Sequence, residues 1–245
     1  MAKKKADPAG DALRELEQTG DRVADWASQN AALILGAIAA ILVIAAGAGL
    51  YVQHGSDARD EAANALALAT SQYRMAMGAD PNGGPIVEPA NPELAVRTRT
   101  KFLERFSAVA REHEGTAAGI VAWLEAGKLQ TELGLLDEAI ASFSAAREAA
   151  GELALGALAS IRLAALAEDR GDPAAAAEAY EAAAGVAAYP MRADALTAAA
   201  RCWVEAGEAD RALAAYQQVE SEYPDERISP PIEALIAELR LSRQP

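Results

Sequence analysis

The side chains best suited to catalysis or metal binding are few in this sequence and far apart. His54 and His113 lie in different segments, and neither has a second ligand at metal-binding spacing, so no metal site and no Ser–His–acid set is expected. The single cysteine, Cys202, excludes an internal disulfide and a multi-cysteine metal centre. Carboxylate pairs such as Asp137 and Glu138 are typical of a solvated acidic helix. We therefore expect a protein that is not an enzyme and binds no metal and no cofactor.

The composition favours stacked helices and disfavours nucleic-acid binding. The chain has 245 residues, of which 52% are hydrophobic but only 5% aromatic, and alanine is the commonest. Small side chains of this kind suit closely packed helices in an all-α fold. Because 36 Asp and Glu outnumber 22 Lys and Arg, the net charge is −14, which repels phosphate backbones. Gly83 and Gly84 precede Pro85 instead of a helix that begins with Lys, so no phosphate-binding loop is expected.

One uncharged stretch, residues 31–52, is long enough to cross a membrane. Its 22 residues, AALILGAIAAILVIAAGAGLYV, would extend about 33 Å as a helix, against a hydrocarbon core of about 30 Å. We expect a single transmembrane helix there, preceded by a short head over residues 1–30. A cleaved signal peptide is the alternative, because Ala46-Gly47-Ala48 resembles a processing site, although the head and the apolar run are long for such a leader.

The basic residues near the span predict its orientation. Five Lys and Arg residues precede it, whereas Arg59 alone lies within the first 16 positions after it. Because positive charge favours the cytoplasmic side, the head is expected in the cytoplasm. Residues 53–245 would then lie beyond the inner membrane, in the periplasm of a diderm bacterium.

Residues 53–112 are expected to form two leading helices separated by a Gly- and Pro-rich loop over residues 78–91. The first helix has one apolar stripe, formed by Ala62, Leu66, Ala69, Tyr73 and Met77. The second is predicted to begin with Asn91 as its cap and Pro92 in its first turn, and to end near Arg111. Its stripe is predicted to comprise Leu94, Thr98, Phe102, Phe106 and Val109. We expect both stripes to be packing faces.

Residues 113–228 contain a repeating pattern. Three glycines, Gly134, Gly171 and Gly207, recur at intervals of 37 and 36 residues. Five positions after each glycine stands an alanine, and four positions after that alanine stands an aromatic residue. The resulting pairs are Ala139 and Phe143, Ala176 and Tyr180, and Ala212 and Tyr216. Upstream of the glycines, small residues stand at Gly127, Ala164 and Ala200, with Trp123 opening the first unit and Pro224 closing the third.

This pattern resembles the tetratricopeptide repeat, in which pairs of antiparallel helices stack into a solenoid. The resemblance implies close helix contact at the small residues, with the aromatic filling the space between neighbouring pairs. Residues 229–245 would then supply a capping helix, in which Pro230 and Pro231 follow Ser229 and an apolar stripe continues to Leu241.

The resemblance also implies a concave face lined by the first helix of each unit. The residues expected there are Leu124, Lys128, Thr131, Ile161, Ala165, Glu168, Thr197, Arg201 and Val204. This mixed lining has few cations, so an apolar or amphipathic polypeptide segment is a better candidate than an acidic tail. The alternative is that these residues pack on the protein's own neighbouring helices.

The layout of a basic head, one span and an exported helical stack resembles the ancillary subunits of the SecYEG translocon, the YfgM-like family, and the repeats resemble those of the cell-division coordinator. This implies a non-enzymatic inner-membrane protein that binds exported polypeptides, translocon components or periplasmic chaperones. The alternative is an envelope scaffold with one fixed partner, in cell division or outer-membrane assembly. Proteins and membrane lipid are thus the expected partners.

Overall fold

The computed structural model describes residues 56–79, 86, 89, 91–224, 234 and 236–238. Within these ranges the chain forms helices joined by turns, and there is no strand. None of the helices in these ranges is long and apolar enough to span a membrane. The predicted head and the predicted span at residues 31–52 lie outside the described ranges, as do most of the loop and of the capping segment.

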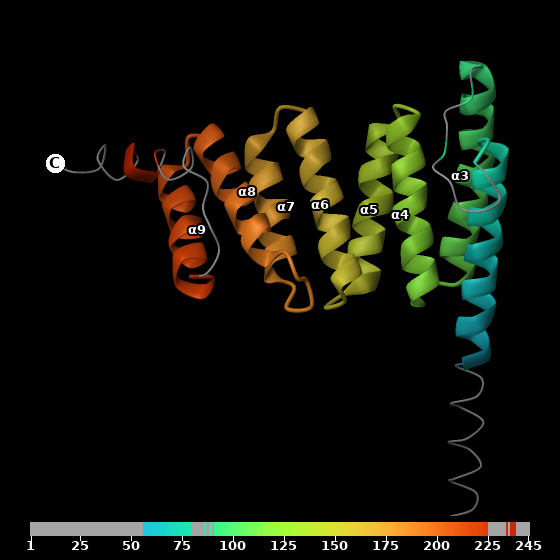
Figure 1. Cartoon of the computed structure of the whole chain (residues 1–245), viewed down its shortest axis with the longest axis horizontal. Helices are drawn as coiled ribbons and strands as arrows, with labels where there is room; N and C mark the ends of the chain where they lie inside the picture. The colour runs from blue at the N-terminus through green and yellow to red at the C-terminus, as the bar shows by residue number, and fades with distance from the viewer. Residues whose placement is uncertain are drawn as a thin grey trace, which may run out of the picture. The chain divides into compact units, whose positions relative to one another are not determined.

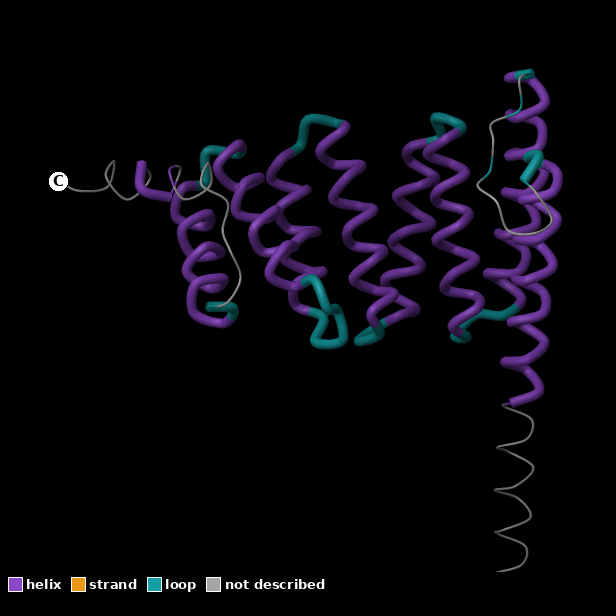
Figure 2. Tube along the Cα trace, viewed as in Figure 1, coloured by secondary structure: helices purple, strands orange, loops and turns teal. Residues whose placement is uncertain are grey.

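The described chain is a row of helices in which each helix packs on the next (Figures 1 and 2). It begins with a helix over residues 56–76, called the leading helix below. The others are α3 (Pro92–Glu112), α4 (Ala117–Glu132), α5 (Leu136–Ala150), α6 (Ala154–Asp169), α7 (Pro173–Gly185), α8 (Arg192–Glu205) and α9 (Ala209–Glu222). Short turns join α4 to α5, α6 to α7 and α8 to α9, which makes each of these pairs an antiparallel unit. The predicted all-α repeat fold is therefore present.

Glycine ends the first helix of every pair by the same turn. Gly134, Gly171 and Gly207 have φ of 75°, 71° and 79°, a left-handed conformation that costs little without a Cβ. In each turn the amide after the glycine donates to a carbonyl five residues back, as from Leu135 to Gln130 at 2.8 Å. Gly78 has φ of 82°, and Ala79 closes the same bond. The leading helix therefore ends as the first helix of a repeat does.

Helix α3 begins as predicted but buries a slightly different face. The Asn91 side chain accepts hydrogen bonds from the amides of Glu93 and Leu94, so its role as the cap is confirmed. The inclusion of Leu94 in the buried stripe is wrong, because this side chain is 50% exposed. Ala95, one residue or about 100° further round the helix, is buried in its place.

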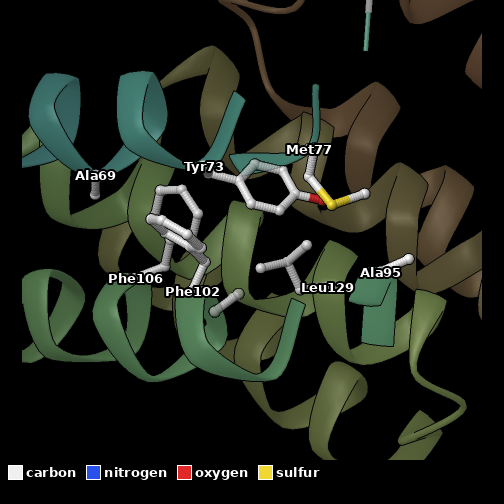
Figure 3. Close-up of a cluster of buried hydrophobic side chains, with 8 residues drawn as sticks. Ala69, Tyr73, Met77, Ala95, Phe102, Phe106 and Leu129 are labelled. Atoms are coloured by element: carbon white, nitrogen blue, oxygen red, sulfur yellow. The ribbon is translucent and has the colours of Figure 1, made fainter. Parts of the chain in front are cut away.

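The leading helix and α3, called the leading pair below, join the repeats through an aromatic cluster (Figure 3). The ring of Tyr73 lies 5.4 Å from that of Phe102 and meets that of Phe106 edge-on at 6.2 Å. Leu129 of α4 lies in the same buried cluster. The predicted stripe of the leading helix is thus confirmed as a packing face, and the leading pair serves as a unit at the start of the stack.

The other end of the stack is covered by part of the predicted capping segment. Ile236 is buried in a cluster with Ala200, Leu213, Ala215 and Tyr216 of the third unit. This contact excludes water from an apolar face that a terminal unit would otherwise expose.

Candidate functional site

An apolar groove of about 780 Å³ lies between the leading helix and the start of α4. Most of the described residues that line it are alanines or larger apolar residues: Ala63, Leu66, Ala67, Thr70, Ser71, Arg74, Met75, Ala79, Ala117, Ala118 and Val121. We call this hollow the leading groove. Because the alanine side chains are short, the backbone of a bound segment can approach both helices closely.

The residues predicted to form a concave binding face do not line this groove. Lys128 and Ala165 are exposed on α4 and α6, as expected for side chains open to a partner. Residues of intermediate exposure are Thr131, Ile161, Glu168, Thr197, Arg201 and Val204. The predicted face is therefore partly covered by its own neighbours.

Leu124 lies inside the stack instead of on an open surface. It is 9% exposed and belongs to a cluster with Ala139 and Phe143 of α5 and Ala159 of α6. Lys128, one helical turn further along α4, points to solvent with Glu125 4.0 Å away. The neighbouring helices close over the aliphatic residue because its burial removes apolar surface from water.

Two of the predicted residues, Glu168 and Arg201, bind each other and hold three helices together. Arg201 of α8 forms an ion pair with Glu168 of α6, and it also donates to Glu205 at 2.9 Å. The hydroxyl of Tyr180 on α7 donates to the second oxygen of Glu168 at 2.8 Å. Two of the three charged residues of the predicted face, Glu168 and Arg201, thus neutralise each other within the protein, while Lys128 remains exposed.

These contacts change the acidity of the groups involved. Burial alone would raise the pKa of Glu168, but hydrogen bonds from Arg201 and Tyr180 outweigh it and lower the pKa below its usual value. Burial and the hydrogen bond to Glu168 raise the pKa of Tyr180 to about 12. Burial also raises the pKa of the Cys202 thiol to about 11, so that this buried cysteine stays protonated at neutral pH.

Glu168→Gln should lower the stability of the stack at neutral pH by about 1 kcal/mol, because a neutral amide replaces the carboxylate between Arg201 and Tyr180. The native pKa of Glu168 lies below the unfolded value. Its contribution is therefore complete above about pH 5 and disappears as the pH falls below about 4. Thermal unfolding of both proteins across this range measures the effect. A gap in Tm that stays constant down to acidic pH would contradict it.

The repeated aromatic residues occupy similar places but differ in their polar contacts. Phe143 is 2% exposed and packs against Gly127, while Tyr180 donates to Glu168. Tyr216 is fully buried, and no described residue accepts a hydrogen bond from its hydroxyl. The residue 12 positions before each aromatic explains the difference between the tyrosines, because Val204 stands before Tyr216 where Glu168 stands before Tyr180.

The substitutions Tyr180→Phe and Tyr216→Phe should therefore change the stability of the protein by different amounts or in opposite directions. Removing the Tyr180 hydroxyl deletes a bond to a charged acceptor and should cost about 1 kcal/mol. The Tyr216 hydroxyl has no hydrogen-bond partner among the described residues, so its removal should be neutral or stabilise the protein by up to about 1 kcal/mol. Thermal unfolding by circular dichroism compares the two, and a greater loss from Tyr216→Phe would refute the assignment.

Sequence reasoning missed a set of ion pairs between successive units. Arg170 pairs with Asp137, Arg201 with Glu168, and Arg211 with Glu178 at 3.5 Å, and the partners are 33 residues apart each time. The sequence did contain a signal for these pairs: oppositely charged residues recur 33 positions apart, slightly less than the intervals of 37 and 36 residues between the glycines. These pairs help to fix how one unit sits on the next, although exposed ion pairs contribute little individually.

The described ranges contain no group of three His, Cys, Asp or Glu side chains that could hold a metal ion. A search of curated proteins found no match to this chain. A comparison with protein families does find one, the tetratricopeptide repeat-like domain, over residues 24–239. The match spans most of the 245 residues and agrees with the stacked helical pairs and their glycine turns. The chain therefore belongs to the tetratricopeptide repeat-like domain family.

Proposed function

We propose that this protein is a membrane-anchored adaptor that binds polypeptides on the exported side of the inner membrane, at the protein translocon. The observation that carries the proposal is the leading groove, an apolar hollow of about 780 Å³ on a fold that serves protein–protein interaction. The charged residues Glu168 and Arg201 are occupied with each other. Apolar contact in the leading groove is thus the better source of affinity.

One feature of the sequence supports the membrane anchor. Residues 31–52 carry no charge over a length that suits a bilayer. An anchor keeps the groove near the membrane and raises its effective concentration for any chain that emerges there.

The translocon is the proposed place of action because the basic head, the span and the helical stack together resemble the YfgM-like family. The stack can meet polypeptides as they emerge or while periplasmic chaperones hold them. The groove involves no chemical step, so binding and release depend on contact alone.

Photo-crosslinking in native membranes tests this proposal. A photoreactive residue is placed in the leading groove at Ala67, and a matched one at Ala141, an exposed alanine of α5 outside that groove. We expect crosslinks from position 67 to translocon components or to exported chains, with few from position 141. Crosslinks to neither class would overturn the proposal, and one stoichiometric partner would indicate an envelope scaffold.

A further inference from the structure

We infer that Met75 is a site of reversible oxidation, at which conversion of the thioether to the sulfoxide weakens polypeptide binding in the leading groove. The effect on binding rests on the proposed function, whereas the oxidation itself rests on the exposure of the side chain. The inference follows from the different places of the methionines that the structure describes, which are Met75, Met77 and Met191.

Met75 is the large apolar residue of the leading groove that is most open to solvent. It is 54% exposed. Leu66 and Val121, the other large apolar residues of the lining, are only partly exposed. The remaining lining residues are alanines or carry polar groups. A polypeptide bound in the groove would therefore cover the Met75 thioether.

The other two described methionines separate exposure from position. Met77 is 1% exposed and lies in the aromatic cluster beside Tyr73 (Figure 3). Met191 is 53% exposed, but it precedes α8 and does not line the leading groove. Because an oxidant must reach the sulfur, we expect Met75 and Met191 to react and Met77 to be protected.

A peroxide, such as hydrogen peroxide, is the oxidant of this step. A lone pair of the Met75 sulfur attacks one peroxide oxygen, so that an S–O bond forms and the O–O bond breaks. The sulfur loses two electrons, and the released hydroxide takes up the proton of the transferred oxygen and leaves as water. Methionine sulfoxide reductases reverse the step with two electrons from a thiol, and the oxygen then leaves as water.

The sulfoxide would oppose burial of this part of the groove. Its oxygen accepts hydrogen bonds, which water provides while the groove is open. A partner that covers position 75 with apolar groups removes this water and leaves the oxygen without a donor. The fold does not require the same burial, because Met75 faces solvent. Oxidation should therefore weaken binding about tenfold and leave the helical stack intact.

Peptide mapping by tandem mass spectrometry tests the oxidation step. The full chain in lipid nanodiscs is treated with hydrogen peroxide, and the fraction of sulfoxide at each methionine is followed with time. We expect Met75 and Met191 to oxidise at similar rates, each at least about tenfold faster than Met77. Protection of Met75 to the level of Met77 would overturn the assignment.

Photo-crosslinking from position 67 in native membranes tests the effect on binding. Each form of the protein is compared with itself before and after peroxide treatment. We expect crosslinks to fall by up to about tenfold in the parent protein and in Met191→Leu, but to change little in Met75→Leu. Methionine sulfoxide reductase with dithiothreitol should restore the crosslinks of the parent protein.

A polar side chain without peroxide provides the second comparison. Met75→Gln places a hydrogen-bonding group of similar length in the leading groove and should lower the crosslinks by up to about tenfold. Met191→Gln is the matched control and should leave them unchanged, because this exposed residue lies outside the groove. Circular dichroism checks that each variant is folded.

Each outcome decides a separate point. An equal loss of crosslinks in Met75→Leu and in the parent protein would place the cause elsewhere and overturn the inference. Unchanged crosslinks from a parent protein with fully oxidised Met75 would also overturn it, and the proposed function would stand. If position 67 crosslinks to neither translocon components nor exported chains before oxidation, the proposed function fails and the effect on binding fails with it, while the mapping still decides whether Met75 is the oxidised residue.

Discussion

Trp203→Ala is expected to destabilise the helical stack by about 3–5 kcal/mol, the largest loss among the substitutions considered. The indole is 1% exposed and lies among alanines of α7 and α9, such as Ala176 and Ala212. Because these neighbours are short, they cannot fill the cavity that truncation leaves. The Trp203 Nε1 donates to Glu181 at 2.7 Å, and the Arg211 guanidinium lies 3.4 Å from the ring centroid. The Glu181 carboxylate and the Arg211 guanidinium would each lose a partner.

Thermal unfolding of the full chain in mild detergent measures this loss as a fall in Tm of about 10 °C. Trp123→Ala is the matched control, since Trp123 is only partly buried and opens the first unit. It should lower the Tm by less than Trp203→Ala. A greater loss from Trp123→Ala would contradict the packing described for the third unit.

Gly127→Ala is expected to destabilise the stack by about 1–3 kcal/mol, although alanine is the better helix former. A Cβ at Gly127 would lie 2.7–2.9 Å from three ring carbons of Phe143. The ring is 2% exposed and packed on several sides, so it cannot move away without displacing other core residues. Unfolding of the variant by heat or urea measures the cost.

The double variant Gly127→Ala with Phe143→Leu identifies the source of that cost. If the clash is responsible, the alanine should do less harm beside the smaller leucine than beside Phe143, so the two changes should not be additive. An alanine at position 127 that raises stability by about 1 kcal/mol, as at an open helix position, would contradict the close packing.

The elements that sequence reasoning predicted well are those with local causes. Gly134, Gly171 and Gly207 recur because a left-handed turn after a helix favours a residue without a Cβ. Asn91 and Pro92 predict the start of α3 because capping depends on neighbouring amides. The stacking of units follows from the resemblance that the small and aromatic positions carry, and the family match supports it.

Features that depend on how helices meet could not be predicted from spacing alone. The leading groove is built from alanines such as Ala67 and Ala118, which look in sequence like any other alanine of this chain. The pairing of Arg201 with Glu168 depends on the offset between α6 and α8. Because of this offset, the two partners are 33 residues apart in the sequence and not 36, the interval between the glycines of these units. The burial of Leu124 also depends on how helices meet, because α5 and α6 pack over this side chain.

The compartment of the carboxyl terminus tests the central claim most directly. A reporter that is active only outside the cytoplasm, fused after Pro245 of the full chain, should be active, and its cytoplasmic counterpart should be inactive. The fusion should also remain membrane-bound at its full length. A carboxyl terminus in the cytoplasm, or a shortened form released from the membrane, would contradict an anchored adaptor on the exported side.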